Sequence, residues 1–176
     1  MQPDPEFSSP LLMSATFGKL HRAIVKIGPG GIGVSFPLAD KTPGDCIRVH
    51  GSKQSLEELM HLDWLRGMKD YVYTSGISEI PKATKYRIIS RFQPKSSVER
   101  MYRRSVNKGW ISLEEAEKKC TDISDSKIKL PYLEVKSQSS GQRYRLFFKQ
   151  GNIVNEPRDG EFSSYGLSTQ ATVPWF

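Results

Sequence analysis

The chain has 176 residues, of which 37% are hydrophobic and 10% aromatic, a composition typical of one folded domain or two small domains packed together. No stretch approaches the roughly 20 apolar residues of a membrane-spanning helix, and the N-terminus lacks a secretory signal, so we expect a soluble, cytoplasmic protein that does not engage a membrane. The net charge of +7 favours an acidic partner.

The first half of the chain predicts alternating helices and short strands. Pro10 suits the first turn of a helix, and apolar residues at helical spacing extend that helix over residues 10–26. Glycines at 28–31 end it. We then expect strands at Ile32–Phe36 and Cys46–His50, a helix over Ser52–Met68 and a strand at Tyr71–Tyr73. This order is most of a ferredoxin-like βαββαβ unit that lacks its first strand.

The second half predicts further strands around a helix. Residues Lys85–Gln93 alternate as in a strand, which places Arg91 and Gln93 on one face. Ser96 with Glu99, and Ser112 with Glu115, have the spacing of capping boxes that start two helices. Strands are expected at Tyr132–Gln138 and Arg143–Phe148, and the apolar C-terminus is expected to pack against the fold.

The positive charge lies almost entirely in one segment. Residues 82–108 contain nine basic side chains and one acid, a net charge of +8, so the rest of the chain sums to −1. A solvated helix face is the usual interpretation of a charge run, but such faces interleave acids with bases. Here the predicted helix over 97–108 has a basic face, which favours binding to nucleic acid. Its members are Arg100, Arg103, Arg104 and Lys108.

Other patterns are less specific by themselves. Gly28, Gly30 and Gly33 match GxGxxG, but a helix precedes them and a strand follows, the reverse of a dinucleotide-binding site. The three histidines lack metal-ligand spacing, and His21 alone is more often a packed residue than a catalyst. Ser137 lies in a polar hairpin loop. Tyr144, between two arginines, could stack on a base or belong to the core.

Five short stretches taken together resemble one family over the whole chain. The chain is similar to the subtype I-F CRISPR repeat-processing endoribonucleases, the Csy-type members of the Cas six family. The stretches are Phe17-Gly18-Lys19-Leu20-His21, Ile32-Gly33-Val34-Ser35-Phe36-Pro37, Ser137-Gln138-Ser139, Tyr165-Gly166-Leu167-Ser168 and Val173-Pro174-Trp175-Phe176.

The resemblance implies an α+β protein with two domains. Residues 1–83 would form a ferredoxin-like catalytic domain, and residues 84–176 a smaller α/β RNA-binding domain whose arginine-rich helix, 97–108, enters the major groove of a repeat hairpin. The family's first strand would precede this chain's start, so we expect that strand to be absent through a misassigned start or a truncation. The basic helix also departs from the family, because Tyr102, Asn107 and Lys108 stand where its pattern is richer in arginine.

The resemblance also implies a role for each matching residue. His21 would be the general base on a ribose 2′-hydroxyl, Ser137 would hold that ribose, and Tyr165 would support the histidine. Arg91 and Gln93 would read bases at the foot of the stem. Tyr144 would stack on the terminal base pair, and Arg100, Arg103 and Arg104, with Lys108 beside them, would contact phosphates and groove edges.

The expected reaction needs no metal or cofactor, because RNA carries its own nucleophile in the 2′-hydroxyl. The enzyme would stay on its product hairpin as a subunit of a type I-F guide-RNA surveillance complex. Two alternatives remain open at this point. One is an RNA-binding module without catalysis, and the other is a basic protein that binds duplex DNA.

Overall fold

The computed structural model describes residues 1–176 except 83, 94–97, 117–127 and 138–140. For residues 98–101 it describes the backbone but not the side chains. The chain forms two compact units. One consists of Met1–Phe92 and Leu130–Phe176, and the other of Gln93–Lys129. In the described part of the chain, no helix is both long and apolar enough to cross a membrane.

Helix α1 spans Ser9–Ile27, which confirms the helix expected over 10–26. Its stripe of Met13, Phe17, Leu20 and Ile24 is fully buried. Burying each such side chain contributes about 1.5–3 kcal/mol, so packing rather than helix propensity holds α1 in place. The helix ends at Gly28, whose φ of +95° a residue with a side chain rarely adopts.

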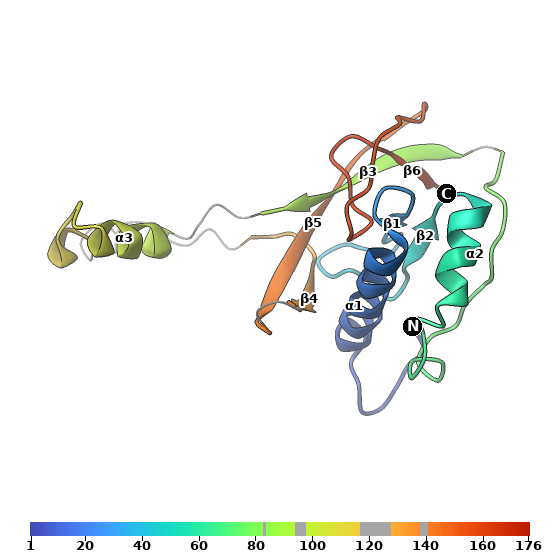
Figure 1. Cartoon of the computed structure of the whole chain (residues 1–176), viewed down its shortest axis with the longest axis horizontal. Coiled ribbons are helices and arrows are strands. Elements are labelled where there is room, and N and C mark those ends of the chain that lie inside the picture. The colour runs from blue at the N-terminus through green and yellow to red at the C-terminus, as the bar shows by residue number, and fades with distance from the viewer. Residues whose placement is uncertain (83, 94–97, 117–127, 138–140) are drawn as a thin grey trace. The chain divides into compact units, whose positions relative to one another are not determined.

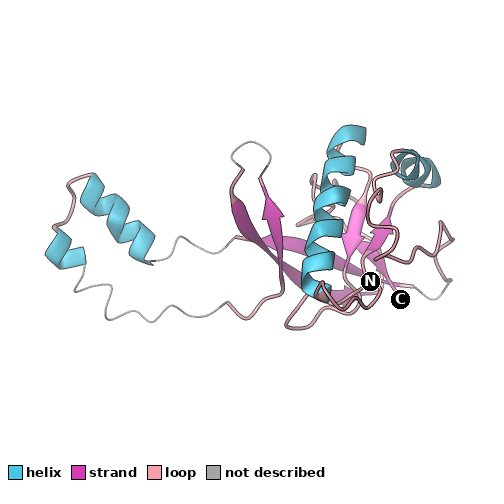
Figure 2. Cartoon of the chain, turned by 90° about the horizontal axis from the view of Figure 1, so that it is seen from below, coloured by secondary structure: helices cyan, strands magenta, loops and turns pink. Residues whose placement is uncertain are grey.

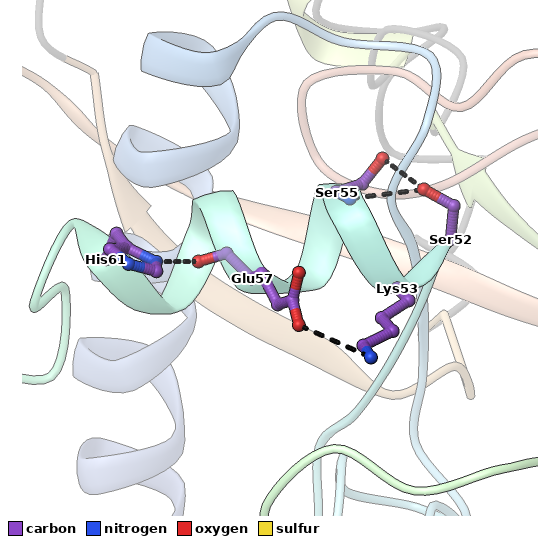
Figure 3. A network of polar contacts seen from close by, with 5 residues as sticks. All are labelled: Ser52, Lys53, Ser55, Glu57 and His61. Atoms are coloured by element: carbon purple, nitrogen blue, oxygen red, sulfur yellow. Dashed lines mark hydrogen bonds and ion pairs between the residues drawn. The ribbon is translucent and has the colours of Figure 1, made fainter.

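Strands β1 (Gly33–Ser35) and β2 (Arg48–His50) form a two-stranded antiparallel sheet inside the two segments where strands were expected. Helix α2, Lys53–His61, follows directly. The Ser52 hydroxyl accepts a hydrogen bond from the Ser55 N–H at 3.1 Å and so satisfies a free donor of the first turn (Figure 3).

Two expectations for this half are wrong. Helix α2 ends at His61 rather than Met68, because Asp63 adopts a φ of +42° that an α-helix cannot continue through. Tyr71–Tyr73 is not a strand: Tyr71 lies in a turn, its carbonyl accepts from the Gln2 N–H at 2.8 Å, and Tyr73 is 79% exposed. This segment therefore has none of the ladder bonds that a sheet strand requires.

The main sheet is antiparallel and has the strand order β4-β5-β3-β6. Strand β5 continues past the expected Phe148, and β6 is the C-terminal segment that was expected to pack. Strand β3 ends one residue before Gln93. Arg91 and Gln93 therefore do not share a strand face, although the sequence predicts that they do. The bounds are Lys85–Phe92 for β3, Tyr132–Lys136 for β4, Arg143–Val154 for β5 and Val173–Trp175 for β6.

The core lies between α1 and this sheet, and α1 packs most closely on β4 (Figures 1 and 2). Phe36 stacks on Phe148 with 4.4 Å between ring centroids, and Phe17 lies beside Phe36. Helices and an antiparallel sheet sharing one core make this an α+β protein, as expected from the sequence.

The unit Gln93–Lys129 contains α3, Val98–Asn107, in place of the helix expected over 97–108. Residues 113–116 are also helical. The capping box expected there is confirmed: the Glu115 N–H donates to the Ser112 hydroxyl, and the Ser112 N–H donates to the Glu115 carboxylate, both at 3.1 Å. The other expected capping box includes Ser96, which lies outside the described residues.

Candidate active site

His21 lies two turns before the end of α1 with its ring half-buried. Its Nδ1 is 2.8 Å from the backbone oxygen of Ser164. A carbonyl oxygen can only accept a hydrogen bond, so Nδ1 must carry the proton. The neutral imidazole therefore has its lone pair on Nε2, the nitrogen that can take up a proton.

The phenol ring of Tyr165 holds the imidazole from one side. The two rings are stacked, with centroids 4.2 Å apart and planes 12° from parallel. The same tyrosine ring lies parallel to Phe17, one helical turn before His21, at 6.4 Å. Packing and the Nδ1 bond together fix the orientation of the His21 ring, which is what a catalytic base requires.

The loop that carries Ser164 and Tyr165 is tied to the fold on both sides of them. The Gly166 carbonyl accepts from the Val34 N–H at 2.8 Å, and the Ser168 N–H donates to the Ile89 carbonyl at 2.9 Å. Gly166 has a φ of +69°, and a Cβ there would lie 2.3 Å from a methyl carbon of Val34. Only glycine fits this place, so the sequence Tyr165-Gly166 aims the tyrosine at His21.

A pair of phenols extends the site from Tyr165 to β5. The hydroxyls of Tyr144 and Tyr165 are 2.5 Å apart. Burial, the hydrogen bond to Tyr165 and the proximity of that second phenol raise the pKa of Tyr144 to about 12, although Arg91 opposes the rise. Tyr144 therefore stays protonated at neutral pH and can donate a hydrogen bond.

Arg91 adds a cation to the same cluster from β3. Its guanidinium carbon lies 5.4 Å from the ring centroid of Tyr165 and 5.9 Å from that of Tyr144, within the range of a cation–π interaction. Arg91 and Tyr165 also line an open cavity of about 570 Å³, together with Ser164 and the loop that follows. The cavity gives a polar ligand access to the side chains around His21.

Ser137 immediately follows β4, at the end where β4 turns into β5. Its N–H donates to the Gln142 carbonyl at 2.8 Å, and its carbonyl accepts from the Gly141 N–H, so it lies in a hairpin as expected. Two residues further into the ladder, past the Lys136–Arg143 pair, Tyr144 is opposite Val135. The role of Ser137 in holding a ribose stays a prediction.

The remaining expected RNA-binding residues belong to the other unit. Gln93 is exposed and follows the end of β3. Arg103 and Arg104 are exposed on α3, while Tyr102 and Ser105 are half-buried, so the basic side chains occupy an outward face. Arg100 is in the same helix, and Lys108 follows it with its Nζ 4.6 Å from the ring centroid of Trp110.

The other two histidines have structural contacts. The Nε2 of His50 is 2.8 Å from the hydroxyl of buried Ser35, and burial followed by the charge of Arg48 lowers the pKa of His50 to about 4. His61 bonds through Nδ1 to the Glu57 carbonyl one turn earlier in α2, at 2.7 Å (Figure 3). His50 thus has a packed role and His61 a surface role.

The sequence matches the family model described as CRISPR-associated protein (Cas_Csy4) over residues 1–176. The chain belongs to this family. It is 47% identical over 174 residues to the CRISPR-associated endonuclease Cas6/Csy4 of Escherichia coli (strain UTI89 / UPEC), covering 99% of this chain and 95% of that protein. It is 41% identical over 179 residues to the protein of the same name from Pseudomonas aeruginosa (strain UCBPP-PA14), covering 100% and 96%.

Membership of the Csy4 family confirms the resemblance inferred from the five short stretches. The structure brings His21, Tyr165, Tyr144 and Arg91 into one cluster, although they come from α1, a C-terminal loop, β5 and β3. Sequence reasoning missed the Ser164 carbonyl. No side-chain pattern reports a backbone acceptor, and the only local signal was the glycine two residues later.

Proposed function

We propose that this chain is an endoribonuclease that cuts CRISPR repeat RNA at the base of its stem–loop without using a metal ion. Both relatives are named endonucleases. The observation that carries the proposal is the 2.8 Å contact between His21 Nδ1 and the Ser164 carbonyl. It makes Nε2 the basic nitrogen, and the two residues that hold the ring, Ser164 and Tyr165, also line an open cavity.

The chemistry follows from that nitrogen. Nε2 of His21 removes the proton from the 2′-hydroxyl of the nucleotide just upstream of the cut. The 2′-oxygen then attacks phosphorus while the bond from phosphorus to the 5′-oxygen breaks, and the leaving oxygen takes up a proton. The products are a 2′,3′-cyclic phosphate on the hairpin and a 5′-hydroxyl on the downstream strand. General base catalysis contributes about 10² to 10⁴ in rate, so alignment of the ribose must supply much of the rest.

Ser137 and Tyr165 serve that alignment in this proposal. Ser137 holds the ribose, and its place at the β4–β5 hairpin, two residues from the ladder pair of Val135 and Tyr144, is compatible with that role. Tyr165 keeps the imidazole in one orientation through the 4.2 Å stack. Neither side chain takes part in proton transfer.

Recognition is divided between the two units. Tyr144 stacks on the terminal base pair of the stem, and Arg91 with Gln93 reads base edges beside it. Arginine pairs well with guanine and glutamine with adenine through two hydrogen bonds each. Arg100, Arg103, Arg104 and Lys108 contact phosphates and groove edges, and the exposure of Arg103 and Arg104 supports this.

The proposal includes the finer features implied by the family. Residues 1–83 form a ferredoxin-like catalytic domain, and residues 84–176 form the RNA-binding domain. The enzyme then stays on the product hairpin within a type I-F surveillance complex. Because His21 precedes residue 84 and Tyr165 follows it, catalysis depends on both parts of the chain.

The test is to incubate the purified chain with its repeat RNA in excess EDTA and to analyse the product ends. We expect one cut at the base of the stem, a cyclic phosphate on the upstream product and a 5′-hydroxyl on the downstream one. Tight binding without cutting would instead identify an RNA-binding module. Cutting that requires added magnesium, or that leaves a 5′-phosphate, would contradict the mechanism.

A further inference from the structure

The Tyr165 ring that packs against His21 is held at its hydroxyl end by a second tyrosine. Tyr165 lies in the loop between β5 and β6, and its hydroxyl is 2.5 Å from that of Tyr144 on β5. Phenol oxygens at this separation share a hydrogen bond. Among the described residues, no other group forms a hydrogen bond with the Tyr165 hydroxyl.

Stacking by itself does not fix the Tyr165 side chain. Its ring is within 12° of parallel to His21 and within 10° of parallel to Phe17, but the apolar burial that favours such stacks is non-directional. The bonds of Gly166 and Ser168 hold the backbone of the loop, and the side-chain torsions of Tyr165 remain. A hydrogen bond weakens steeply as its angle bends, so the bond to Tyr144 fixes the end of the ring that stacking leaves free.

Tyr144 is a firm anchor for that bond. Strand β5 lies between β4 and β3 in the main sheet (Figure 1), and Tyr144 pairs with Val135 of β4. Its half-buried ring packs against the core. Side chains on strands are held more precisely than side chains on loops. The bond between the hydroxyls therefore fixes a loop residue to the sheet.

The surroundings of the two phenols preserve the bond at neutral pH. Burial, followed by the hydrogen bond to Tyr165 and the proximity of that phenol, raises the pKa of Tyr144 to about 12, so Tyr144 keeps its proton where a histidine acts as a base. The guanidinium of Arg91 lies within 6 Å of both ring centroids, at 5.4 Å from Tyr165 and 5.9 Å from Tyr144, and is attracted to both rings.

The orientation of the His21 ring depends on the Tyr165 ring as well as on the Ser164 carbonyl. One hydrogen bond, from Nδ1 to that carbonyl, leaves the imidazole free to turn about the line of the bond. The stacked phenol, 4.2 Å away, blocks that turn. Catalytic groups must be held within about 0.5 Å of their productive positions, so a shift of the Tyr165 ring slows the reaction without unfolding the site.

We propose that Tyr144 is a positioning residue for His21: its hydroxyl holds the Tyr165 ring against the imidazole and so keeps Nε2 directed at the ribose 2′-hydroxyl. This inference rests on the proposed function, in which His21 is the general base and the Tyr144 ring stacks on the terminal base pair. The ring of Tyr144 then serves binding and its hydroxyl serves catalysis. One chain of contacts joins the foot of the stem to the base, and Tyr144 transfers no proton.

The test removes the hydroxyls and keeps the rings, in Tyr144→Phe, Tyr165→Phe and the double variant. The matched control is Tyr132→Phe. Tyr132 is half-buried on β4, its ring contacts Phe147 at 5.4 Å, and its hydroxyl forms no hydrogen bond within the described ranges. Single-turnover cleavage is measured at saturating protein, and affinity is measured on a hairpin with a 2′-deoxy nucleotide upstream of the cut.

We expect Tyr144→Phe and Tyr165→Phe each to cleave about 3- to 10-fold more slowly, the factor that loss of one neutral hydrogen bond gives, and to bind the hairpin as tightly as wild type. Both changes remove the same bond, so the double variant should be no slower than the slower single variant. Tyr132→Phe should cleave at the wild-type rate.

Proton NMR of the RNA-free chain tests the contact without any cleavage. The carbon-bound ring protons of His21 lie against the face of Tyr165, and its ring current shifts them upfield. The chain has three histidines, so the His21→Asn variant identifies these signals. Tyr144→Phe should move them back toward ordinary histidine positions, and Tyr132→Phe should not.

Wild-type cleavage by Tyr144→Phe, losses that multiply in the double variant, or a parallel loss of affinity would each overturn the inference. So would His21 signals that stay in place in Tyr144→Phe. A wild-type chain that binds or cuts no repeat hairpin would instead refute the proposed function, and the catalytic part of the inference would fall with it.

Discussion

The backbone oxygen of Ser164 accepts a hydrogen bond from Nδ1 of His21 across 143 residues of sequence, at 2.8 Å. This contact decides which ring nitrogen is basic, and it couples the helix that carries His21 to the loop that carries Tyr165. The loop in turn depends on the carbonyl of Gly166, which accepts from Val34, and on Ile89. The geometry of one imidazole therefore depends on three distant segments.

Replacing His21 by asparagine should abolish cleavage and leave hairpin binding within a few fold of wild type. The asparagine amide can keep the hydrogen bond to the Ser164 carbonyl, but it has no basic nitrogen. General base catalysis is worth about 10² to 10⁴ in rate, so single-turnover cleavage should fall by at least that factor. Filter binding measures the affinity in parallel. If affinity and activity fell together, His21 would be structural.

Gly166→Ala should destabilise the fold by about 2–4 kcal/mol, combining the strain of a left-handed alanine with overpacking against Val34. It should also slow cleavage, because the loop positions both Ser164 and Tyr165. The matched control is Gly76→Ala, since Gly76 has a φ of +75° and a Cβ added there would meet no atom within 4 Å. That variant should lose only about 1 kcal/mol. Urea denaturation measures both, and equal losses would refute the proposed close approach.

Stability should fall on acidification through His50. The pKa of His50 is lowered from 6.5 to about 4 by burial and by the charge of Arg48. Between these two pH values His50 is protonated in the unfolded chain but not in the folded chain. The contribution of His50 to the free energy of unfolding should therefore be constant above pH 6.5. It should decline by up to about 3 kcal/mol between pH 6.5 and 4. His50→Gln should show a shallower decline in that window. Parallel curves for wild type and His50→Gln would count against this origin.

Arg91 and Arg103 should differ in what their loss does to recognition. If Arg103 contacts a phosphate, as proposed, Arg103→Ala should weaken binding to many hairpins alike and lower the salt slope by about 0.7–0.9. If Arg91 reads a base edge, as proposed, Arg91→Ala should cost about 1–3 kcal/mol of discrimination at the foot of the stem. Salt titrations on matched and base-swapped hairpins measure both. The assignment would be reversed if Arg103→Ala alone altered the ranking of the RNAs.

Periodicity predicts the elements that bury one continuous face. The predicted bounds of α1 are within one residue at each end because its apolar stripe has no interruption. The prediction for α2 is too long because Leu65 and Met68 continue its apolar spacing and are buried, although the backbone already turns at Asp63. The strand predicted at Tyr71–Tyr73 is wrong because alternation cannot report whether a neighbouring strand exists.

The residues of the candidate active site could be predicted in part, from the family resemblance rather than from periodicity. The five short stretches that resemble the Csy4 family contain His21 and Tyr165, and the resemblance adds Tyr144 and Arg91, so the members of the cluster follow from the sequence. The contacts between these members do not follow from the sequence. The Tyr144–Tyr165 hydroxyl pair and the Arg91 contacts depend on how β3 and β5 pair, and the Ser164 contact depends on backbone conformation.

The most direct test of the central claim is to replace the 2′-hydroxyl upstream of the cut with hydrogen and to measure binding and single-turnover cleavage of the same RNA. If Nε2 of His21 activates that hydroxyl, the substituted hairpin should bind as tightly as the natural one and remain uncut, whereas the same substitution one nucleotide further upstream should be cut normally. Cleavage of the first substrate would contradict the account.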